Sequence, residues 1–105
     1  MLKEILKRNN MENNDIELFQ NAVETFGIDA QDKMCIEECA ELINALAKKS
    51  RGRASKEDIL TELADVSIMV DQLALYYGHE DFMNERRKKI MRLNERLLKH
   101  GNHNK

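Results

Sequence analysis

The sequence contains no proline and no tryptophan, and only four of its 105 residues are glycine. Proline and glycine most often interrupt helices and form tight turns, so their scarcity argues against a chain of many short strands. Leucine, alanine, glutamate, lysine and methionine supply much of the sequence instead, and these residues favour helices. The composition therefore predicts an all-α protein, and the length predicts one domain with a small core.

Long apolar runs are also missing. No segment approaches the length that crosses a membrane, and the N-terminal residues lack the apolar stretch of a secretory signal. The formal net charge is only −2, a balance that does not favour nonspecific binding of nucleic acid. We therefore expect a cytoplasmic protein that has neither a membrane nor a nucleic-acid partner.

Cysteine is scarce too, with Cys35 and Cys39 as its two occurrences. The pair could contribute two ligands to zinc, but no second pair of cysteine or histidine stands at matching spacing. We favour the alternative that both are small buried residues in a reducing compartment.

Apolar residues recur at helical spacing in four segments, at about 15–26, 29–49, 55–77 and 80–99. Gly27, Gly78 and Gly101 follow three of these segments and are suited to end helices. Ser55 with Asp58 three residues later resembles a capping box at the start of the third segment. We expect an N-terminal extension or linker at 1–14, the helical domain at 15–99, and a disordered tail at 100–105.

The second and third predicted helices share one plan, in which a polar row runs beside an apolar stripe. We expect the stripes to form the core seam; they consist of Cys35, Cys39, Leu42 and Leu46 in one helix and of Ile59, Leu63, Val66, Val70, Leu73 and Tyr77 in the other. Phe82, Ile90, Leu93 and Leu97 of the last helix should face the same bundle. These stripes exceed what one small bundle needs to bury, so we expect a homodimer or a dimer of dimers.

The polar rows beside these stripes carry paired carboxylates. Glu38 and Glu41 are three residues apart, as are Glu62 and Asp65, and this spacing places each pair on one helix face. Two such helices packed together would gather the four carboxylates, which repel one another unless cations bind. Hard oxygen ligands of this kind suit Mg²⁺. A solvated acidic face remains the alternative for either pair alone.

The motif Glu38-x-x-Glu41, followed by Glu62-x-x-Asp65 and accompanied by Glu37 and Leu42, resembles the signature of the all-α nucleoside triphosphate pyrophosphohydrolases, the MazG-like superfamily. The resemblance covers about residues 19–97. It implies an oligomeric four-helix MazG-like bundle, a dimer or a tetramer. It also implies Mg²⁺-dependent hydrolysis of deoxynucleoside or non-standard nucleoside triphosphates to monophosphate and pyrophosphate, which serves nucleotide-pool housekeeping. Mn²⁺ would be a substitute metal.

The resemblance also assigns roles to single residues. It implies that Glu38, Glu41, Glu62 and Asp65 are metal ligands and that Lys89 and Arg92, which resemble a Lys-x-x-Arg in the last helix of some members, bind phosphate. We expect Glu37 and Glu38 to be the catalytic residues, with Glu37 as general base or as a carboxylate behind the metal ligands. Glu37 paired with Lys33 at the surface is an equal alternative.

Three further residues are candidates for substrate binding because they lie on or near the acidic row: Gln31, Lys33 and Lys48, with the two lysines as the weaker ones. A solvated basic face is the alternative for Lys89 and Arg92. The alternative function for the whole chain is a non-catalytic helical, oligomeric interaction module of the same fold. A nucleic-acid adaptor would depend on the basic last helix alone.

Overall fold

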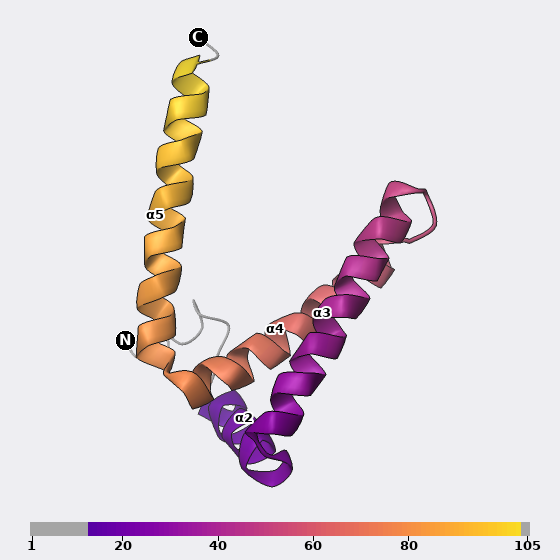
Figure 1. The fold of residues 1–105 in the computed structure, drawn as a ribbon, viewed down its shortest axis with the longest axis vertical. Coiled ribbons are helices and arrows are strands. Elements are labelled where there is room, and N and C mark those ends of the chain that lie inside the picture. Colours follow the sequence, from indigo (N-terminus) through magenta and orange to yellow (C-terminus); the bar gives the residue numbers. More distant parts are fainter. Residues whose placement is uncertain (1–12, 104–105) are drawn as a thin grey trace.

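The computed structural model describes residues 13–103, which form four α-helices and no strand. These are α2 (Asn13–Phe26), α3 (Ile28–Ser50), α4 (Lys56–Tyr77) and α5 (His79–His103), shown in Figure 1. The predicted all-α fold is confirmed. α2 begins inside the expected linker, and α5 continues past residue 100, where a disordered tail was expected; residues 1–12 and 104–105 lie outside the described range.

The helix boundaries follow from local chemistry. Gly27 and Gly78 are the single residues between α2 and α3 and between α4 and α5, with φ of 87° and 135°. Only glycine adopts this region at little cost, because it has no Cβ. The predicted capping box is present: Ser55 Oγ accepts from the Asp58 N–H at 3.1 Å, and the Asp58 carboxylate accepts from the Ser55 N–H at 2.9 Å.

α3 and α4 form an antiparallel hairpin, which is the most extensive helix contact in the described chain (Figure 1). α2 lies at the base of the hairpin and packs mainly against α4. α5 leaves the end of α4 at Gly78 and extends away from the hairpin, so the described helices form an open V rather than a closed bundle. No helix in the described range is both long and apolar enough to cross a membrane.

The core is small. Its buried apolar side chains are Phe19 and Val23 from α2, Ala45 from α3, and Met69 and Ala74 from α4. Two polar side chains are buried with them, and they satisfy each other: Gln31 Nε2 donates to Gln72 Oε1 at 2.7 Å. Because each amide has a partner, the pair avoids the cost of an unpaired buried polar group.

The predicted core seam is wrong in its details. Leu46, Leu63 and Tyr77 of the apolar stripes are exposed, at 45%, 47% and 64%. Met69 and Gln72 continue the row of Glu62 and Asp65 at helical spacing beside the stripe, and they are 5% and 6% exposed. The polar rows therefore lie in the α3–α4 interface, and the apolar stripes lie at its edge or face outward. Both rows have helical period, so periodicity alone does not identify which one packs.

The last helix also differs from expectation. Ile90, Leu93 and Leu97 were expected to face the bundle, but they are exposed because α5 extends away from α3. Cys35 and Cys39 are half-buried free thiols rather than fully buried residues.

Candidate metal centre

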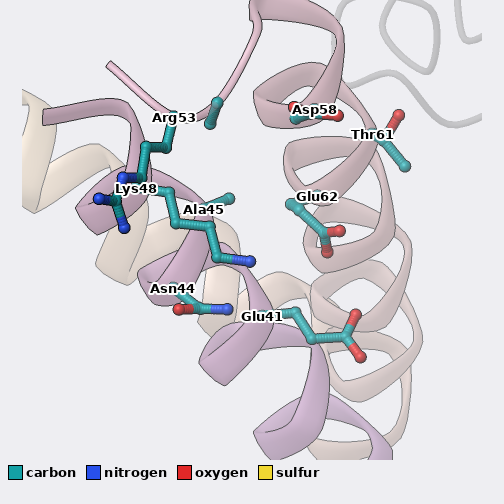
Figure 2. A pocket seen from close by; sticks show the side chains of 9 residues that line it. Glu41, Asn44, Ala45, Lys48, Arg53, Asp58, Thr61 and Glu62 are labelled. Atoms are coloured by element: carbon teal, nitrogen blue, oxygen red, sulfur yellow. The ribbon is translucent and has the colours of Figure 1, made fainter. Parts of the chain in front are cut away.

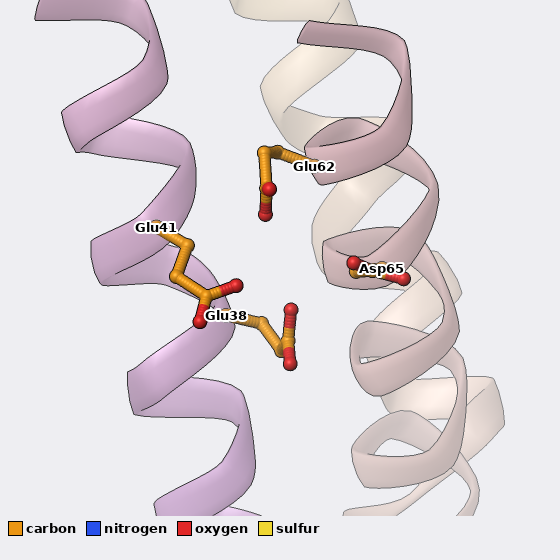
Figure 3. A group of neighbouring side chains, drawn as sticks. All are labelled: Glu38, Glu41, Glu62 and Asp65. Carbon is orange, nitrogen blue, oxygen red and sulfur yellow. The ribbon is translucent and has the colours of Figure 1, made fainter. Parts of the chain in front are cut away.

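Four carboxylates converge between α3 and α4. Glu38 and Glu41 extend from α3, Glu62 and Asp65 extend from α4, and one oxygen of each lies within 4.8 Å of those of the other three. Figure 3 shows the four side chains directed into the space between the two helices. The spacing of three residues puts each pair on one helix face, and the antiparallel packing of the hairpin brings the two faces together.

The four carboxylates form no salt bridge with any described residue. Glu38 Oε2 and Glu62 Oε2 are inaccessible to solvent and have no hydrogen-bond partner in the described structure. The only salt bridge within residues 13–103 joins Lys88 to Glu85 on α5, so no basic side chain pairs with the cluster. A buried carboxylate oxygen without a partner is costly, and a bound cation would relieve that cost.

The local environment shifts the protonation of two of these groups. Burial raises the pKa of Glu38, and repulsion from Glu41, Asp65 and Glu62 raises it further. The pKa of Glu62 is raised by burial first and then by Glu41 and Asp65. Both shifts have the same origin: the folded chain confines negative charge in a region with little water.

The ligand chemistry fits a hard divalent cation. Mg²⁺ and Mn²⁺ prefer oxygen ligands, and two helices in contact hold the four carboxylates at fixed relative positions. Sites with two such cations about 3.5–4 Å apart are common where phosphate groups are hydrolysed. The predicted ligand set is thus brought together in one place, where a bound cation would offset the mutual repulsion of the carboxylates.

Glu37 lies outside this cluster. It is exposed on α3, and one helical step turns it about 100° away from the direction of Glu38. Lys33, one turn earlier, is exposed as well, and no ion pair joins it to Glu37 in the described structure. The alternative surface pair is therefore not formed, and the role of Glu37 as a base stays a prediction.

A cavity of about 340 Å³ adjoins the cluster at the loop end of the hairpin. Glu41 and Glu62 lie on its wall, together with Asn44, Lys48 and Arg53 (Figure 2). Lys48 was a weaker candidate from the sequence, whereas Arg53 was not among the predicted site residues. A signal for Lys48 was present, because it continues the row of Glu38, Glu41 and Ala45 along α3 at helical spacing.

The other predicted substrate residues lie elsewhere. Gln31 is buried, and its amide is engaged by Gln72 rather than directed into the cavity. Lys89 and Arg92 are exposed on α5, which diverges from the hairpin, and neither lines the cavity. A single chain does not bring these two residues to the carboxylates, so their contacts with substrate stay predictions.

A scan against protein-family models, a search of curated proteins and a search of solved structures each found no match. The resemblance to the MazG-like superfamily therefore depends on the motif residues of this chain alone.

Proposed function

We propose that the protein is a Mg²⁺-dependent nucleoside triphosphate pyrophosphohydrolase of the MazG-like type, acting on deoxynucleoside or non-standard nucleoside triphosphates in nucleotide-pool housekeeping. The observation that supports this proposal most is the convergence of four carboxylates, two of them with buried and unpaired oxygens, beside a cavity. The reaction itself comes from the resemblance of Glu38-x-x-Glu41 and Glu62-x-x-Asp65 to the superfamily motif.

In this proposal Glu38, Glu41, Glu62 and Asp65 hold the cations at fixed positions between two helices. Bound Mg²⁺ would neutralise phosphate oxygens and make a nearby water more acidic. The water oxygen forms a bond to the α-phosphorus, and the bond from that phosphorus to its bridging oxygen breaks. Pyrophosphate leaves with the bonding electrons, and Glu37 is our candidate to accept the proton of the water.

A nucleotide panel tests the proposal. With Mg²⁺, we expect monophosphate and pyrophosphate from at least one triphosphate, no turnover in EDTA, and recovery with Mg²⁺ or Mn²⁺. Glu38→Gln and Asp65→Asn should each lower kcat/KM on the order of a hundredfold or more. Each removes a ligand of the cation whose positive charge stabilises the transition state. Turnover of no nucleotide, or full activity of Glu38→Gln, would contradict the proposal.

Glu95→Gln is the matched control for these variants. Glu95 is exposed on α5 and does not belong to the carboxylate cluster. Its substitution therefore removes one negative charge but leaves all four metal ligands in place. Its kcat/KM should stay within about twofold of the wild type, as expected for a screened surface charge.

The second candidate is a non-catalytic helical interaction module. It is favoured by the large apolar side chains exposed on α3, α4 and α5, which suit contact with another protein. We propose that the protein self-associates as a dimer or tetramer in either case. The module differs from the enzyme in one measurable way: it self-associates without thermal stabilisation by Mg²⁺ and without nucleotide turnover.

A further inference from the structure

Two basic residues line the cavity beside the carboxylates at its loop end. Lys48 follows Glu41 by about two turns on the same face of α3, and Arg53 lies in the loop at 51–55. Figure 2 shows the Lys48 side chain extending into the space between α3 and α4, on the side where Glu41 and Glu62 stand. A volume of about 340 Å³ lies within the range of small-molecule sites, about 300–1,000 Å³.

Both basic residues are free to bind a ligand. Neither Lys48 nor Arg53 forms an ion pair with any residue of the described chain. Asp58 also lines the cavity, but its carboxylate accepts from the Ser55 N–H in the capping box. The cap bonds lower the pKa of Asp58, with a smaller contribution from Lys48, so this group stays ionised and committed to the start of α4.

The charges of the cavity make anion binding conditional on a metal. Its wall holds three carboxylates, Glu41, Asp58 and Glu62, against the two cations. Without metal, the cavity therefore carries more negative than positive charge and repels phosphate. Divalent cations on Glu41 and Glu62 reverse this balance, after which the two basic side chains and the metal attract the same anion.

The opposite direction along the hairpin offers no such partners. On the other side of the carboxylates, the facing positions of α3 and α4 hold the buried residues Gln31, Met69 and Gln72. These side chains are uncharged and packed together, so they leave neither room nor counter-charge for a polyphosphate. Only the loop end of the groove provides both.

We infer that Lys48 and Arg53 bind the terminal phosphates of the substrate, so that a nucleoside triphosphate lies along the α3–α4 groove with its pyrophosphate end toward the loop at 51–55. A guanidinium pairs with two phosphate oxygens at once, and an ammonium supplies a concentrated charge. The inference rests on the proposed function and deepens it: the length of the phosphate chain selects the substrate, and triphosphates bind better than diphosphates.

Inorganic tripolyphosphate is the probe that tests this subsite without turnover. Isothermal titration of the full chain should show binding with saturating Mg²⁺ and none in EDTA. Lys48→Gln and Arg53→Gln should each weaken tripolyphosphate binding roughly tenfold, the loss expected for one charged hydrogen bond. Lys48→Arg should retain most of the affinity, because it keeps the charge.

Lys49→Gln and Arg51→Gln are matched controls, since they remove the same charges from adjacent residues that do not line the cavity. Each should change the affinity by less than about twofold. An equal loss of tripolyphosphate affinity in all four glutamine variants would indicate nonspecific electrostatic attraction rather than a subsite. That result would overturn the inference. Tight binding of tripolyphosphate in EDTA would overturn it too.

A separate titration with Mn²⁺ alone distinguishes this inference from the proposed function. Lys48→Gln should bind Mn²⁺ as the wild type does, because it retains all four carboxylates. If the wild type binds Mn²⁺ but no tripolyphosphate, the subsite is refuted and the metal centre stands. If the wild type binds no Mn²⁺, the metal centre fails and the inference with it.

Discussion

Glu38 and Glu62 each hold a carboxylate oxygen that solvent does not reach and that no described residue hydrogen-bonds. Folding therefore brings negative charge into a poorly hydrated space, where Glu41 and Asp65 add repulsion. A sequence selected only for stability would place apolar or paired residues here. This cost is explained if a bound cation completes the cluster and offsets its negative charge.

This cost makes the metal-free protein sensitive to pH. The pKa values of Glu38 and Glu62 are higher in the folded chain than their usual 4.5, so the folded state binds protons more tightly than the unfolded state. Repulsion among these carboxylates therefore does not destabilise the folded protein when the pH is below the usual pKa. It destabilises the protein fully when the pH is above the raised pKa values. We expect the Tm in EDTA to fall as the pH rises above the usual value of 4.5, measured by circular dichroism.

Glu38→Gln tests the cause of that dependence. The substitution removes one charge from the cluster, so in EDTA at about pH 8 it should raise the Tm above that of the wild type and flatten its pH dependence. It should also abolish the rise in Tm that Mg²⁺ gives the wild type. Asp58 does not affect this test. Its pKa is lowered in the folded protein, so its contribution to stability is lost only at more acidic pH. A Glu38→Gln protein less stable than the wild type in EDTA would contradict this account.

Single residues determine where the helices begin and end. At the start of α4, the contribution of one such residue to stability can be measured. Ser55→Ala removes one of the two hydrogen bonds of the cap, the one that Ser55 Oγ accepts from the Asp58 N–H. The Asp58 carboxylate can still accept from the backbone N–H of residue 55. We expect the free energy of unfolding to fall by about 1 kcal/mol, with a range of about 0.5–2 kcal/mol. Urea denaturation in Mg²⁺ provides the measurement.

Ser67→Ala is the matched control for the cap. Ser67 is exposed within α4, and its Oγ donates to the Ala64 carbonyl of the same helix. Because alanine is the better helix former, this substitution should be neutral or slightly stabilising. Equal destabilisation by the two variants would show that the cap does not determine the stability of α4.

The parts of this architecture that were predictable from sequence depend on neighbours along the chain. Gly27, Gly78 and the Ser55 cap indicate helix ends locally, and three-residue spacing puts Glu38 with Glu41 on one face whatever the tertiary structure. The convergence of both carboxylate pairs required one further condition, that the two helices pack on those faces. The predicted core seam would have left these carboxylate faces at the edge of the α3–α4 contact. In the structure, they lie between the two helices.

What escaped prediction depends on contacts between distant residues. Gln31 lies on the same row as Glu38, and only the partner Gln72, 41 residues away, makes it a core residue. Arg53 lies in a loop with no periodic pattern, and its place on the cavity wall follows from the way the hairpin closes. Neither position can be read from spacing along one helix.

The molecule as a whole is more extended than a compact domain of its length. Its radius of gyration is 16.8 Å, whereas about 13 Å is expected for a compact chain of this size. Large apolar side chains stay exposed on all four helices; those on the last three include Ile36, Ile43 and Leu46 on α3, Leu60 and Leu63 on α4, and Ile90, Leu93 and Leu97 on α5. α5 cannot cover α3 within one chain, because it diverges from the hairpin (Figure 1).

We therefore expect light scattering to give at least twice the mass of one chain at micromolar concentration. Leu93→Glu should shift the protein toward monomer, because burying an unpaired carboxylate costs at least about 2 kcal/mol, more than tenfold in the dissociation constant. Lys99→Gln is the matched control: it changes the charge by the same single negative unit, but on the face of α5 opposite the apolar stripe. A monomeric wild type, or equal dissociation by both variants, would contradict self-association through α5.

The same variant separates assembly from the metal centre. All four carboxylates come from the α3–α4 hairpin of a single chain, so monomeric Leu93→Glu should bind Mn²⁺ with the affinity of the wild type. Lys89 and Arg92, in contrast, lie on α5 and do not line the cavity of their own chain. If these two residues bind phosphate, they do so in the cavity of another copy, and the monomer should lose turnover while it keeps the metal. Loss of Mn²⁺ binding on dissociation would instead show that the hairpin does not form the site alone.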